Sequence, residues 1–385
     1  MNPKNIVILG STGSIGENAV KVINHFPNEL KLYGISAKNN VKKLAKQALD
    51  NSAKFATVSD EKYLGEFKSI IGEKTTALAG EKGLIQMATD ANTDMILCSI
   101  VGTNGLIPVI EAIKCGKNIA LASKEILVMA GDIVMSLAKK HNVKILPVDS
   151  EHSAVFQCLE GKKKSDISKI ILTASGGPFK GFSQKGLKNV SVKEALNHPT
   201  WRMGQKVSID SATMMNKALE VIEARWLFDV PVEKIKVVIH PQSIIHSMVE
   251  FIDGTVLAQM SLPDMKYPIQ NALTYPHRHQ GVVKPLDFAK IANLTFEEPD
   301  HKNFPSLKIA ESALKTGGTM PVVLNAANEI AVDLFMKNLL SFTKIWMLVQ
   351  KVMEQHNPVK NPSLEEILAS DNWARRKTEE IANSL

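Results

Sequence analysis

The chain has 385 residues, of which 44% are apolar and 22% charged, which excludes a disordered or fibrous protein. At about 100–200 residues per domain, this length predicts two or three domains. The 46 Lys and Arg residues outnumber the 39 Asp and Glu residues to give a net charge of +7, but they are scattered and only 5% of residues are aromatic. Because a nucleic-acid-binding face needs clustered basic and stacking aromatic side chains, we expect no nucleic-acid partner. A modest positive field favours a small anionic substrate instead.

No segment of the sequence predicts a membrane span or a secretory signal. The longest stretch without charged residues, Met95–Ile110, contains two glycines and a proline, whereas a membrane helix needs about 20 apolar residues. The apolar run at the N-terminus is too short for a signal peptide. Cys98, Cys115 and Cys158 form no C-x-x-C pair, so neither a disulfide framework nor a thiolate zinc site is expected. These features predict a cytoplasmic protein without a membrane partner.

The first part of the chain alternates β-rich runs with amphipathic segments such as Glu17–Phe26 and Val41–Asp50. This alternation predicts βαβ units and a doubly wound parallel sheet of the Rossmann type over residues 1–148. The predicted strands are Ile6–Leu9, Leu30–Ser36, Lys54–Val58, Met95–Ser99, Asn118–Leu121 and Lys144–Pro147.

The pattern changes near Asp149, and residues 149–274 predict an α+β domain. Strands are expected at Lys169–Thr173 and Lys236–Ile239, with a long helix at Ser211–Phe228. Met248–Ile252 and Thr255–Met260 are joined by Asp-Gly, which favours a hairpin with a tight primed turn. Residues 275–300 are rich in Pro, His and Lys and predict a linker. Residues 301–385 have only helical periodicity and predict a C-terminal α-helical bundle.

A glycine turn follows the first predicted strand, with the spacing Gly10-x-x-Gly13-x-x-Gly16. Glycine lets the backbone approach a pyrophosphate, and the start of the next helix offers free N–H groups, so this turn favours a dinucleotide site. Thr12, Ser14 and Ile15 would lie against the phosphates. The second strand ends in Ala37, Lys38 and Asn39 without the carboxylate typical of an NAD site, so a 2′-phosphate and therefore NADP is favoured.

Two carboxylates, Asp149 and Glu151, follow the last strand of this region. If the backbone stays extended, they face the same way, and their mutual repulsion favours a hard divalent ion such as Mg²⁺ or Mn²⁺ between them. A general acid and base couple is the alternative, and a solvated loop is the simplest non-functional interpretation. We expect the third metal ligand to be Glu220.

Glu220 belongs to the predicted helix Ser211–Phe228, whose apolar stripe is formed by Met215, Leu219, Ile222 and Trp226. Asn216, Lys217 and Glu220 share another face of that helix. Asn216 and Lys217 would bind an anion beside the metal. Glu223 has no assigned task, and we interpret it as a surface residue.

Ser175 opens a Gly-Gly turn that exposes N–H groups and favours an anion nest, although such a turn is often only structural. The segment from Asn197 to Lys206 combines His198, Trp201, Met203 and Gly204 without a clear period, which is typical of a loop that closes over a substrate. Trp201 as an anchor of the core is the alternative. His240 and His246 are interpreted as structural.

Seven motifs together closely resemble the 1-deoxy-D-xylulose 5-phosphate reductoisomerase family over essentially the whole chain. They are Gly10-Ser-Thr-Gly-Ser-Ile-Gly16, Leu121-Ala-Ser-Lys124-Glu125, Pro147-Val-Asp-Ser-Glu-His152, Thr173-Ala-Ser-Gly-Gly-Pro-Phe179, His198-Pro-Thr-Trp-Arg-Met-Gly204, Ser211-Ala-Thr-Met-Met-Asn-Lys-Ala-Leu-Glu220 and His240-Pro-Gln-Ser-Ile-Ile-His246. The resemblance implies a homodimer of three-part subunits that acts in the methylerythritol phosphate route to isoprenoid precursors. It also implies reduction with NADPH after a retro-aldol/aldol or ketol rearrangement, and dimerisation through residues 149–274.

The resemblance assigns a role to each matching position. The implied metal ligands are Asp149, Glu151 and Glu220, and the implied catalytic residues are Lys124, Glu151, His198 and Glu220. Contacts to the phosphorylated sugar would come from Lys124, Ser150, Glu151, Ser175, His198, Ser211, Asn216, Lys217 and Glu220. NADPH would contact Thr12, Gly13, Ser14, Ile15, Ala37, Lys38, Asn39, Ser123, Glu125 and Gly204.

The chain departs from the family at two cofactor positions, because Ser123 and Ala37 stand where relatives commonly have Asn and Gly.

Two alternative functions remain open from the sequence. One is another NADP-linked, metal-assisted oxidoreductase, such as a ketol-acid reductoisomerase or a homoserine-type dehydrogenase, which needs no phosphate on its substrate. The other is a non-catalytic NADP sensor, which has no use for the three acidic residues.

Overall fold

The computed structural model describes residues 2–384, and the chain forms two compact units. The first unit comprises residues 1–126, 134–153 and 264–286, and the second comprises residues 127–133, 154–263 and 287–385. Helices α6 (Glu125–Lys140) and α7 (Ser150–Cys158) contribute residues to both units. The three-domain division with a linker at residues 275–300 stays a prediction.

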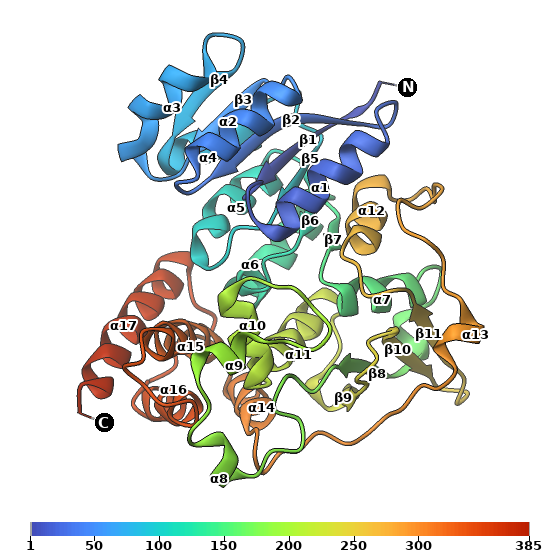
Figure 1. The fold of residues 1–385 in the computed structure, drawn as a ribbon, viewed down its shortest axis with the longest axis vertical. Coiled ribbons are helices and arrows are strands. Elements are labelled where there is room, and N and C mark those ends of the chain that lie inside the picture. Colours follow the sequence, from blue (N-terminus) through green and yellow to red (C-terminus); the bar gives the residue numbers. More distant parts are fainter. Residues whose placement is uncertain (1, 385) are drawn as a thin grey trace. The chain divides into compact units, whose positions relative to one another are not determined.

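A seven-stranded parallel sheet organises the described residues of the first unit, in the order β4-β3-β2-β1-β5-β6-β7 (Figure 1). The central strand β1 is apolar, and Ile6, Val7, Ile8 and Leu9 are fully buried, as expected for a sheet covered on both faces. The order reverses beside β1, where doubly wound sheets bind their ligands at the carboxyl ends of the strands. The strands are β1 (Lys4–Leu9), β2 (Leu30–Ala37), β3 (Phe55–Val58), β4 (Thr76–Ala79), β5 (Met95–Cys98), β6 (Asn118–Leu121) and β7 (Ile145–Pro147).

The predicted Rossmann-like sheet is therefore confirmed, although strand β4 was not expected from the sequence. β4 is a four-residue edge strand that is only partly buried, so it has neither the length nor the apolar pattern that reveals the other strands. The helices of this unit besides α6 are α1 (Ser14–His25), α2 (Val41–Asp50), α3 (Leu64–Ile71), α4 (Gly80–Thr89), α5 (Leu106–Lys114) and α12 (Lys266–Thr274).

The second unit contains a four-stranded mixed sheet in the order β11-β10-β8-β9. Strands β8 (Ile167–Ala174) and β9 (Ile235–Ile239) are parallel, and β10 (Ile245–Phe251) is antiparallel to β8 and to β11 (Val256–Met260). The predicted hairpin is confirmed, but its turn is wider than a two-residue primed turn. Phe251 N donates to Thr255 O at 2.9 Å, and only Gly254 has a positive φ, +84°.

Helices form the remainder of the second unit, and the predicted C-terminal bundle is confirmed. Val322, Val323, Ala326 and Ala327 are fully buried in α15, as their spacing predicts. No described helix combines the length and the apolar character that a membrane crossing requires. The helices besides α7 are α8 (Gln184–Leu187), α9 (Val192–Leu196), α10 (Gln205–Ala212), α11 (Met215–Leu227), α13 (Phe288–Ile291), α14 (Ser306–Thr316), α15 (Met320–Met336), α16 (Lys344–Glu354) and α17 (Leu364–Ala382).

The expected continuous helix Ser211–Phe228 is wrong, because the chain turns between α10 and α11. Met214 has a left-handed backbone conformation with φ of +63°. The Thr213 hydroxyl stabilises both helix ends there: it donates to Asp210 O at 3.1 Å and accepts from Met215 N at 3.3 Å. Ser211 therefore lies in the last turn of α10, and Asn216 lies in the first turn of α11.

Candidate active site

The glycine turn between β1 and α1 has the geometry expected of a phosphate-binding turn. Gly10 has a φ of +95°, and α1 begins at Ser14. A Cβ added at Gly16 would lie 2.3 Å from Gly10 O, so a side chain there would push the turn away from the helix. Gly13 and Ser14 are exposed, so the first N–H groups of α1 are accessible to an anion.

Two serines, the buried Ser36 and the partly buried Ser99, hold this turn in place, and the sequence alone did not single them out. The Ser36 hydroxyl accepts from Gly10 N at 3.1 Å, and the Ser99 hydroxyl donates to Leu9 O at 3.0 Å. Both serines lie at the carboxyl ends of strands next to β1 in the sheet. The order of the strands places Ser36 and Ser99 on either side of the glycine turn, and this order is not encoded in a local sequence pattern.

The end of β2 carries a positive charge and no carboxylate, as predicted. Ala37 is buried, whereas Lys38 and Asn39 are exposed beside the start of α2. Lys43, on the first turn of α2, donates to Thr12 O at 3.2 Å and pairs with Glu17, so a second lysine reaches the glycine turn. Positive charge at this position suits a 2′-phosphate.

Ser123 and Glu125 are both buried between the end of β6 and the start of α6. The Ser123 hydroxyl donates to Ile100 O at 2.5 Å. Its side chain therefore fixes the chain after β5. Cofactor contacts at Ser123 and Glu125 stay a prediction.

Asp149 does not extend strand β7, so the expectation that Asp149 and Glu151 alternate along an extended backbone is wrong. β7 ends at Pro147, and α7 begins at Ser150. Asp149 Oδ1 accepts from Glu151 N at 3.2 Å, which is how an aspartate caps the start of a helix. The two carboxylates thus come from the cap and the first turn of one helix.

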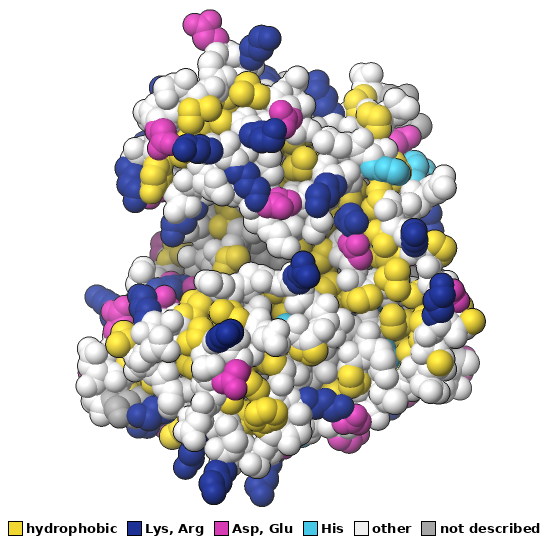
Figure 2. All heavy atoms as spheres, in the orientation of Figure 1, with side chains coloured by type: hydrophobic (Ala, Val, Ile, Leu, Met, Phe, Trp, Pro, Cys, Tyr) yellow, Lys and Arg dark blue, Asp and Glu magenta, His cyan; other side chains and the backbone are white. Residues whose placement is uncertain are grey.

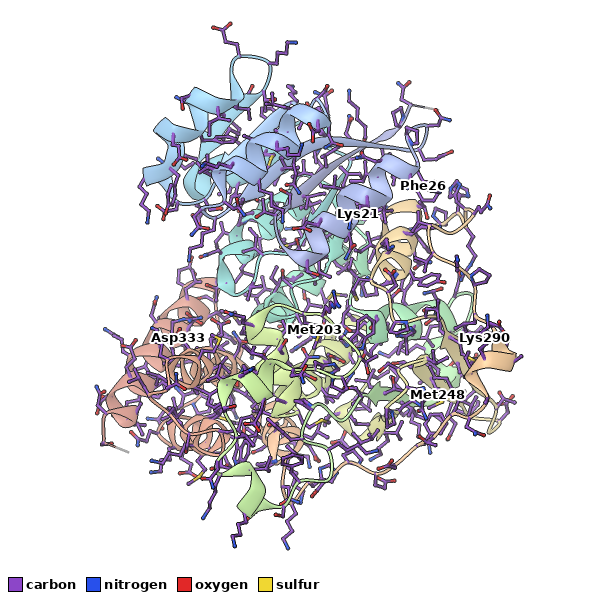
Figure 3. The ribbon with its side chains drawn as sticks, viewed as in Figure 1. Lys21, Phe26, Met203, Met248, Lys290 and Asp333 are labelled. Carbon is purple, nitrogen blue, oxygen red and sulfur yellow. The ribbon has the colours of Figure 1, made fainter. Side chains whose placement is uncertain are left out.

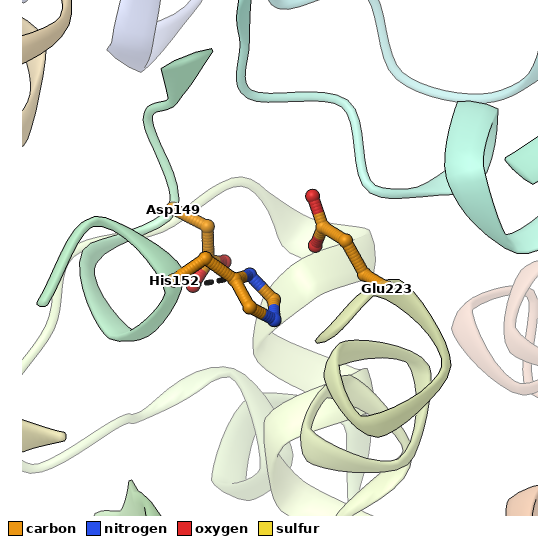
Figure 4. Close-up of side chains that lie close together, drawn as sticks. All are labelled: Asp149, His152 and Glu223. Atoms are coloured by element: carbon orange, nitrogen blue, oxygen red, sulfur yellow. Dashed lines mark ion pairs between the residues drawn. The ribbon is translucent and has the colours of Figure 1, made fainter. Parts of the chain in front are cut away.

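Cationic and hydroxyl groups surround this acidic pair. The ammonium of buried Lys124 lies 2.8 Å from Asp149 Oδ2, and His152 Nδ1 lies 3.4 Å from Asp149 Oδ1 (Figure 4). The Ser150 hydroxyl donates to Glu151 Oε2 at 2.5 Å. Asp149 is therefore held between the ammonium of Lys124 and the first turn of α7.

Glu220 lies on α11 with 1% of its surface exposed. Asn216 Nδ2 donates to Glu220 Oε1 at 2.5 Å, and the ammonium of Lys217 pairs with Glu220 Oε2. A buried carboxylate is costly unless it is paired in this way. The predicted set Asn216, Lys217 and Glu220 is thus brought together on one helix.

Glu223 is fully buried, so its interpretation as a surface residue is wrong. The polar face of α11 does not point to solvent, because the helix is buried on nearly all sides. Among the described residues of α11 from Met215 to Ala224, all except Asn216 are buried.

Ser175 and His198 form a second polar pair in the same unit. Ser175 Oγ and His198 Nε2 are 2.9 Å apart, and Gly177 N donates to Ser175 Oγ at 3.2 Å. His198 Nδ1 accepts from Thr200 N at 3.2 Å and from Trp201 N at 2.9 Å. Burial lowers the pKa of His198. Gly176 and Gly177 have φ of +88° and +70°, which confirms the predicted glycine turn.

The segment between α9 and α10 has no regular structure and carries Trp201 and Met203; Met203 is labelled in Figure 3. Both side chains are partly exposed, so Trp201 is not an anchor of the core. The Trp201 ring lies 6.2 Å from that of His246. Gly204 follows as the N-cap of α10. An aromatic side chain on an irregular segment is suited to closing over a ligand.

His240 has the structural role that the sequence suggested. Its Nδ1 lies 2.9 Å from Thr295 O, its Nε2 accepts from Ile244 N and Ile245 N, and its ring stacks on Phe296. These contacts join β9 and β10 to the segment before α14.

The described cysteines and the visible surface give no sign of a reactive thiolate or of a nucleic-acid-binding patch. The three cysteines are free, and burial raises the pKa of both Cys98 and Cys158 to about 11, so these two thiols stay protonated at neutral pH. Figure 2 shows Lys and Arg side chains scattered among acidic ones on the visible face, without a continuous basic patch.

Comparison with known families gives matches along most of the chain. Residues 6–131 match the family model described as 1-deoxy-D-xylulose 5-phosphate reductoisomerase. Residues 145–228 match the model of the 1-deoxy-D-xylulose 5-phosphate reductoisomerase C-terminal domain, and residues 260–377 match the model of the DXP reductoisomerase C-terminal domain.

Curated relatives of nearly equal length carry the same name. A 1-deoxy-D-xylulose 5-phosphate reductoisomerase from Caldanaerobacter subterraneus subsp. tengcongensis is 50% identical over 97% of this chain and 98% of its own length. One from Thermodesulfovibrio yellowstonii is 51% identical, also over 97% and 98%.

Solved structures agree with these sequence matches. The reductoisomerase from Zymomonas mobilis in complex with NADPH is 40% identical, with a TM-score of 0.94 over 100% of both chains. A DOX-P reductoisomerase in complex with NADPH, fosmidomycin and magnesium is 41% identical, with a TM-score of 0.93 over 99% of this chain and 98% of that chain.

Proposed function

The chain belongs to the 1-deoxy-D-xylulose 5-phosphate reductoisomerase family, and we propose that it catalyses the reaction in the family's name. It would rearrange 1-deoxy-D-xylulose 5-phosphate and reduce the product with NADPH to 2-C-methyl-D-erythritol 4-phosphate, an isoprenoid precursor. The observations that carry the proposal are the glycine turn after β1, whose geometry suits a phosphate, and the lysine that pairs with each of the carboxylates Asp149 and Glu220. A relative solved with NADPH, fosmidomycin and magnesium supports it.

Asp149, Glu151 and Glu220 would hold one divalent ion. Lys124 pairs with Asp149 and Lys217 with Glu220, and a divalent ion would replace these ammonium groups at the carboxylate oxygens. Oxygen ligands of this kind suit Mg²⁺ or Mn²⁺. When bound, the ion would supply a Lewis acid that polarises the sugar carbonyl, and NADPH would supply the hydride.

Ser175, His198, Ser211, Asn216 and Lys217 would bind the phosphate of the sugar. The ammonium of Lys217 supplies charge, and Asn216 and the two serines supply hydrogen-bond donors. Because the phosphate is remote from the reacting carbons, binding energy gained there orients the other end of the substrate. Lys124, Ser150 and Glu151 would contact that other end, where Lys124 orients a hydroxyl and Glu151 also holds the ion.

The segment that carries His198, Trp201 and Met203 would close over the bound sugar. Closure excludes water from the reacting carbonyl and protects an aldehyde intermediate. His198 links this movement to substrate, since it contacts both Ser175 and the backbone of Trp201.

NADPH would bind at the glycine turn with its 2′-phosphate near the end of β2. The exposure of Gly13 and Ser14 at the start of α1 and the charge of Lys38 support this placement. The remaining cofactor contacts would come from Thr12, Ile15, Ala37, Asn39, Ser123, Glu125 and Gly204.

A second copy of this chain would pair with strand β11 to form a homodimer. β11 is an edge strand, and Val256 and Leu257 on it are 46% and 42% exposed. Apolar edge strands are templates for pairing with another strand.

The free cysteines fit a reducing compartment such as the cytoplasm.

One assay separates this function from its alternatives. The purified enzyme is given NADPH and Mg²⁺ with 1-deoxy-D-xylulose 5-phosphate, and in parallel with unphosphorylated 1-deoxy-D-xylulose. We expect 2-C-methyl-D-erythritol 4-phosphate in the first case and a collapse of turnover in the second. Equal turnover of both sugars would favour another NADP-linked oxidoreductase, and NADPH binding without turnover of either would favour a sensor.

A further inference from the structure

Helices α10 and α11 meet at a corner, residues 210–215, and two buried side chains from the C-terminal helices hold this corner in place. We propose that Asn328 and Ser306 are positioning residues for the phosphate of the substrate. The inference rests on the proposed function, since it assumes that Ser211, Asn216 and Lys217 bind that phosphate.

The first contact joins α15 to α10. Asn328 Nδ2 donates to Asp210 Oδ1 at 2.8 Å, and both side chains are at most 1% exposed. Asp210 Oδ2 lies 2.8 Å from the ammonium of Lys206. Hydrogen bonds to a buried charged group are among the stronger ones in proteins, so this contact fixes the rotation of α10 about its axis.

The second contact joins the start of α14 to the turn itself. The Ser306 hydroxyl donates to Thr213 O at 2.7 Å, and both residues are fully buried. Thr213 is the residue whose hydroxyl joins the end of α10 to the start of α11. Met214 follows it in a left-handed conformation that is costly for a residue other than glycine, so external contacts must maintain the turn.

The corner also determines where the Ser175 loop can lie. A Cβ added at Gly177 would fall 2.7 Å from Ser211 O, so the backbone of this loop packs directly on the last turn of α10. A shift of the corner would therefore displace Ser211 and the loop of Ser175 together. One small movement would disturb both sides of the phosphate site.

The charge of Asp210 makes its position important. Asp210 is the neighbour of Ser211 in sequence, and a carboxylate near a sugar phosphate would repel it. Asn328 and Lys206 bind the two oxygens of Asp210 and hold this carboxylate in the interior. The C-terminal helices would thus help to bind substrate without contacting it.

Asn328→Leu and Ser306→Ala test this role, with Thr378→Val as the matched control. Thr378 is fully buried in the same helical region, but its hydroxyl donates to Ala374 O inside α17. We measure kcat and KM for the phosphorylated sugar, the inhibition constant of inorganic phosphate, and the Kd of NADPH, all on the full-length enzyme.

We expect both test variants to raise KM and the phosphate inhibition constant about tenfold, as for the loss of one buried hydrogen bond, with the Kd of NADPH unchanged. A merely structural role would reduce the fraction of folded enzyme, which lowers the apparent kcat and leaves KM unchanged. That pattern, or an equal effect of Thr378→Val, would overturn the proposal.

Asn328→Asp keeps the size of the side chain and replaces the donor by a second carboxylate. We expect it to raise KM at least as much as Asn328→Leu; an unchanged KM would also contradict the proposal. Lys217→Gln distinguishes a failure of the proposed phosphate site from a failure of the proposed positioning role. If Lys217→Gln leaves the phosphate inhibition constant unchanged, the proposed phosphate site is wrong, whereas a loss there without an effect of Asn328→Leu refutes only the positioning role.

Discussion

His198 Nε2 lies 2.9 Å from Ser175 Oγ, while Nδ1 of the same ring accepts two backbone N–H groups. An imidazole nitrogen that accepts cannot carry a proton, so the neutral ring holds its proton on Nε2 and donates it to Ser175. The Ser175 oxygen also accepts from Gly177 N. Its own O–H is thus left to donate to an anion, as a phosphate site requires.

The first prediction concerns the charge of His198. Burial lowers its pKa below the ordinary value of 6.5, so the folded protein binds this proton less readily than the unfolded chain. The contribution of neutral His198 to the free energy of unfolding is therefore fully present above the pKa of the unfolded chain. It is lost as the pH falls from that value towards the lower pKa of the folded protein. A protonated ring would also direct Nδ1–H at the two backbone donors. NMR titration of the ring, assigned with His198→Gln, should give a pKa below 6.5 with the neutral proton on Nε2; a higher pKa would contradict this.

The second prediction concerns Glu220. Glu220→Gln keeps the shape of the side chain and removes its charge, so we expect activity to fall by at least ~10²-fold, as for loss of a strong electrostatic contact in a transition state. The Kd of NADPH should stay nearly the same. Glu233→Gln, an exposed residue of the same unit, is the control. Retained turnover in Glu220→Gln would refute the metal assignment.

The third prediction concerns cofactor choice. Lys38→Asp places a negative charge where the 2′-phosphate is expected, so binding of NADPH should weaken more than binding of NADH. Lys46→Asp makes the same charge change at an exposed position of α2 and serves as the control. Fluorescence titration of both cofactors measures the difference. Equal losses for NADPH and NADH would remove the argument for the 2′-phosphate.

The fourth prediction concerns the dimer. Leu257→Glu puts a charge on the exposed face of the edge strand β11, so we expect sedimentation to show a shift from dimer to monomer. Phe288→Glu changes another exposed apolar residue, which lies on α13, and should leave the dimer intact. A monomeric wild-type protein, or a dimer that survives Leu257→Glu, would show that β11 is not the interface.

The sequence predicts the strands and helices that have a strong apolar period. The buried run at Ile6–Leu9, the Gly10 turn and the stripe beginning at Val322 all follow from local patterns, and the structure confirms them. Thr76–Ala79 was missed, because a short edge strand is stabilised mainly by its pairing with β3. Such pairing is a long-range contact that no local pattern encodes.

The site shows the same limit at three places. The sequence Asp149-Ser-Glu151 is also typical of a helix start in which the Asp is the N-cap. The prediction of an extended backbone there relied only on the strand that precedes it. The residues Ala212–Met215 contain no sequence signal for the end of a helix. Tertiary contacts at the corner between α10 and α11 maintain the left-handed conformation of Met214. The burial of Glu223 likewise depends on helices that pack around α11 from distant parts of the chain.

The most direct test of the account is a crystal of the enzyme soaked with Mn²⁺ and measured at a wavelength where manganese scatters anomalously. We predict one anomalous peak within coordination distance of carboxylate oxygens of Asp149, Glu151 and Glu220, at about 2.0–2.6 Å as for oxygen ligands of hard divalent ions. A peak bound elsewhere, or these three carboxylates too far apart to share one ion with substrate bound, would contradict the proposed chemistry.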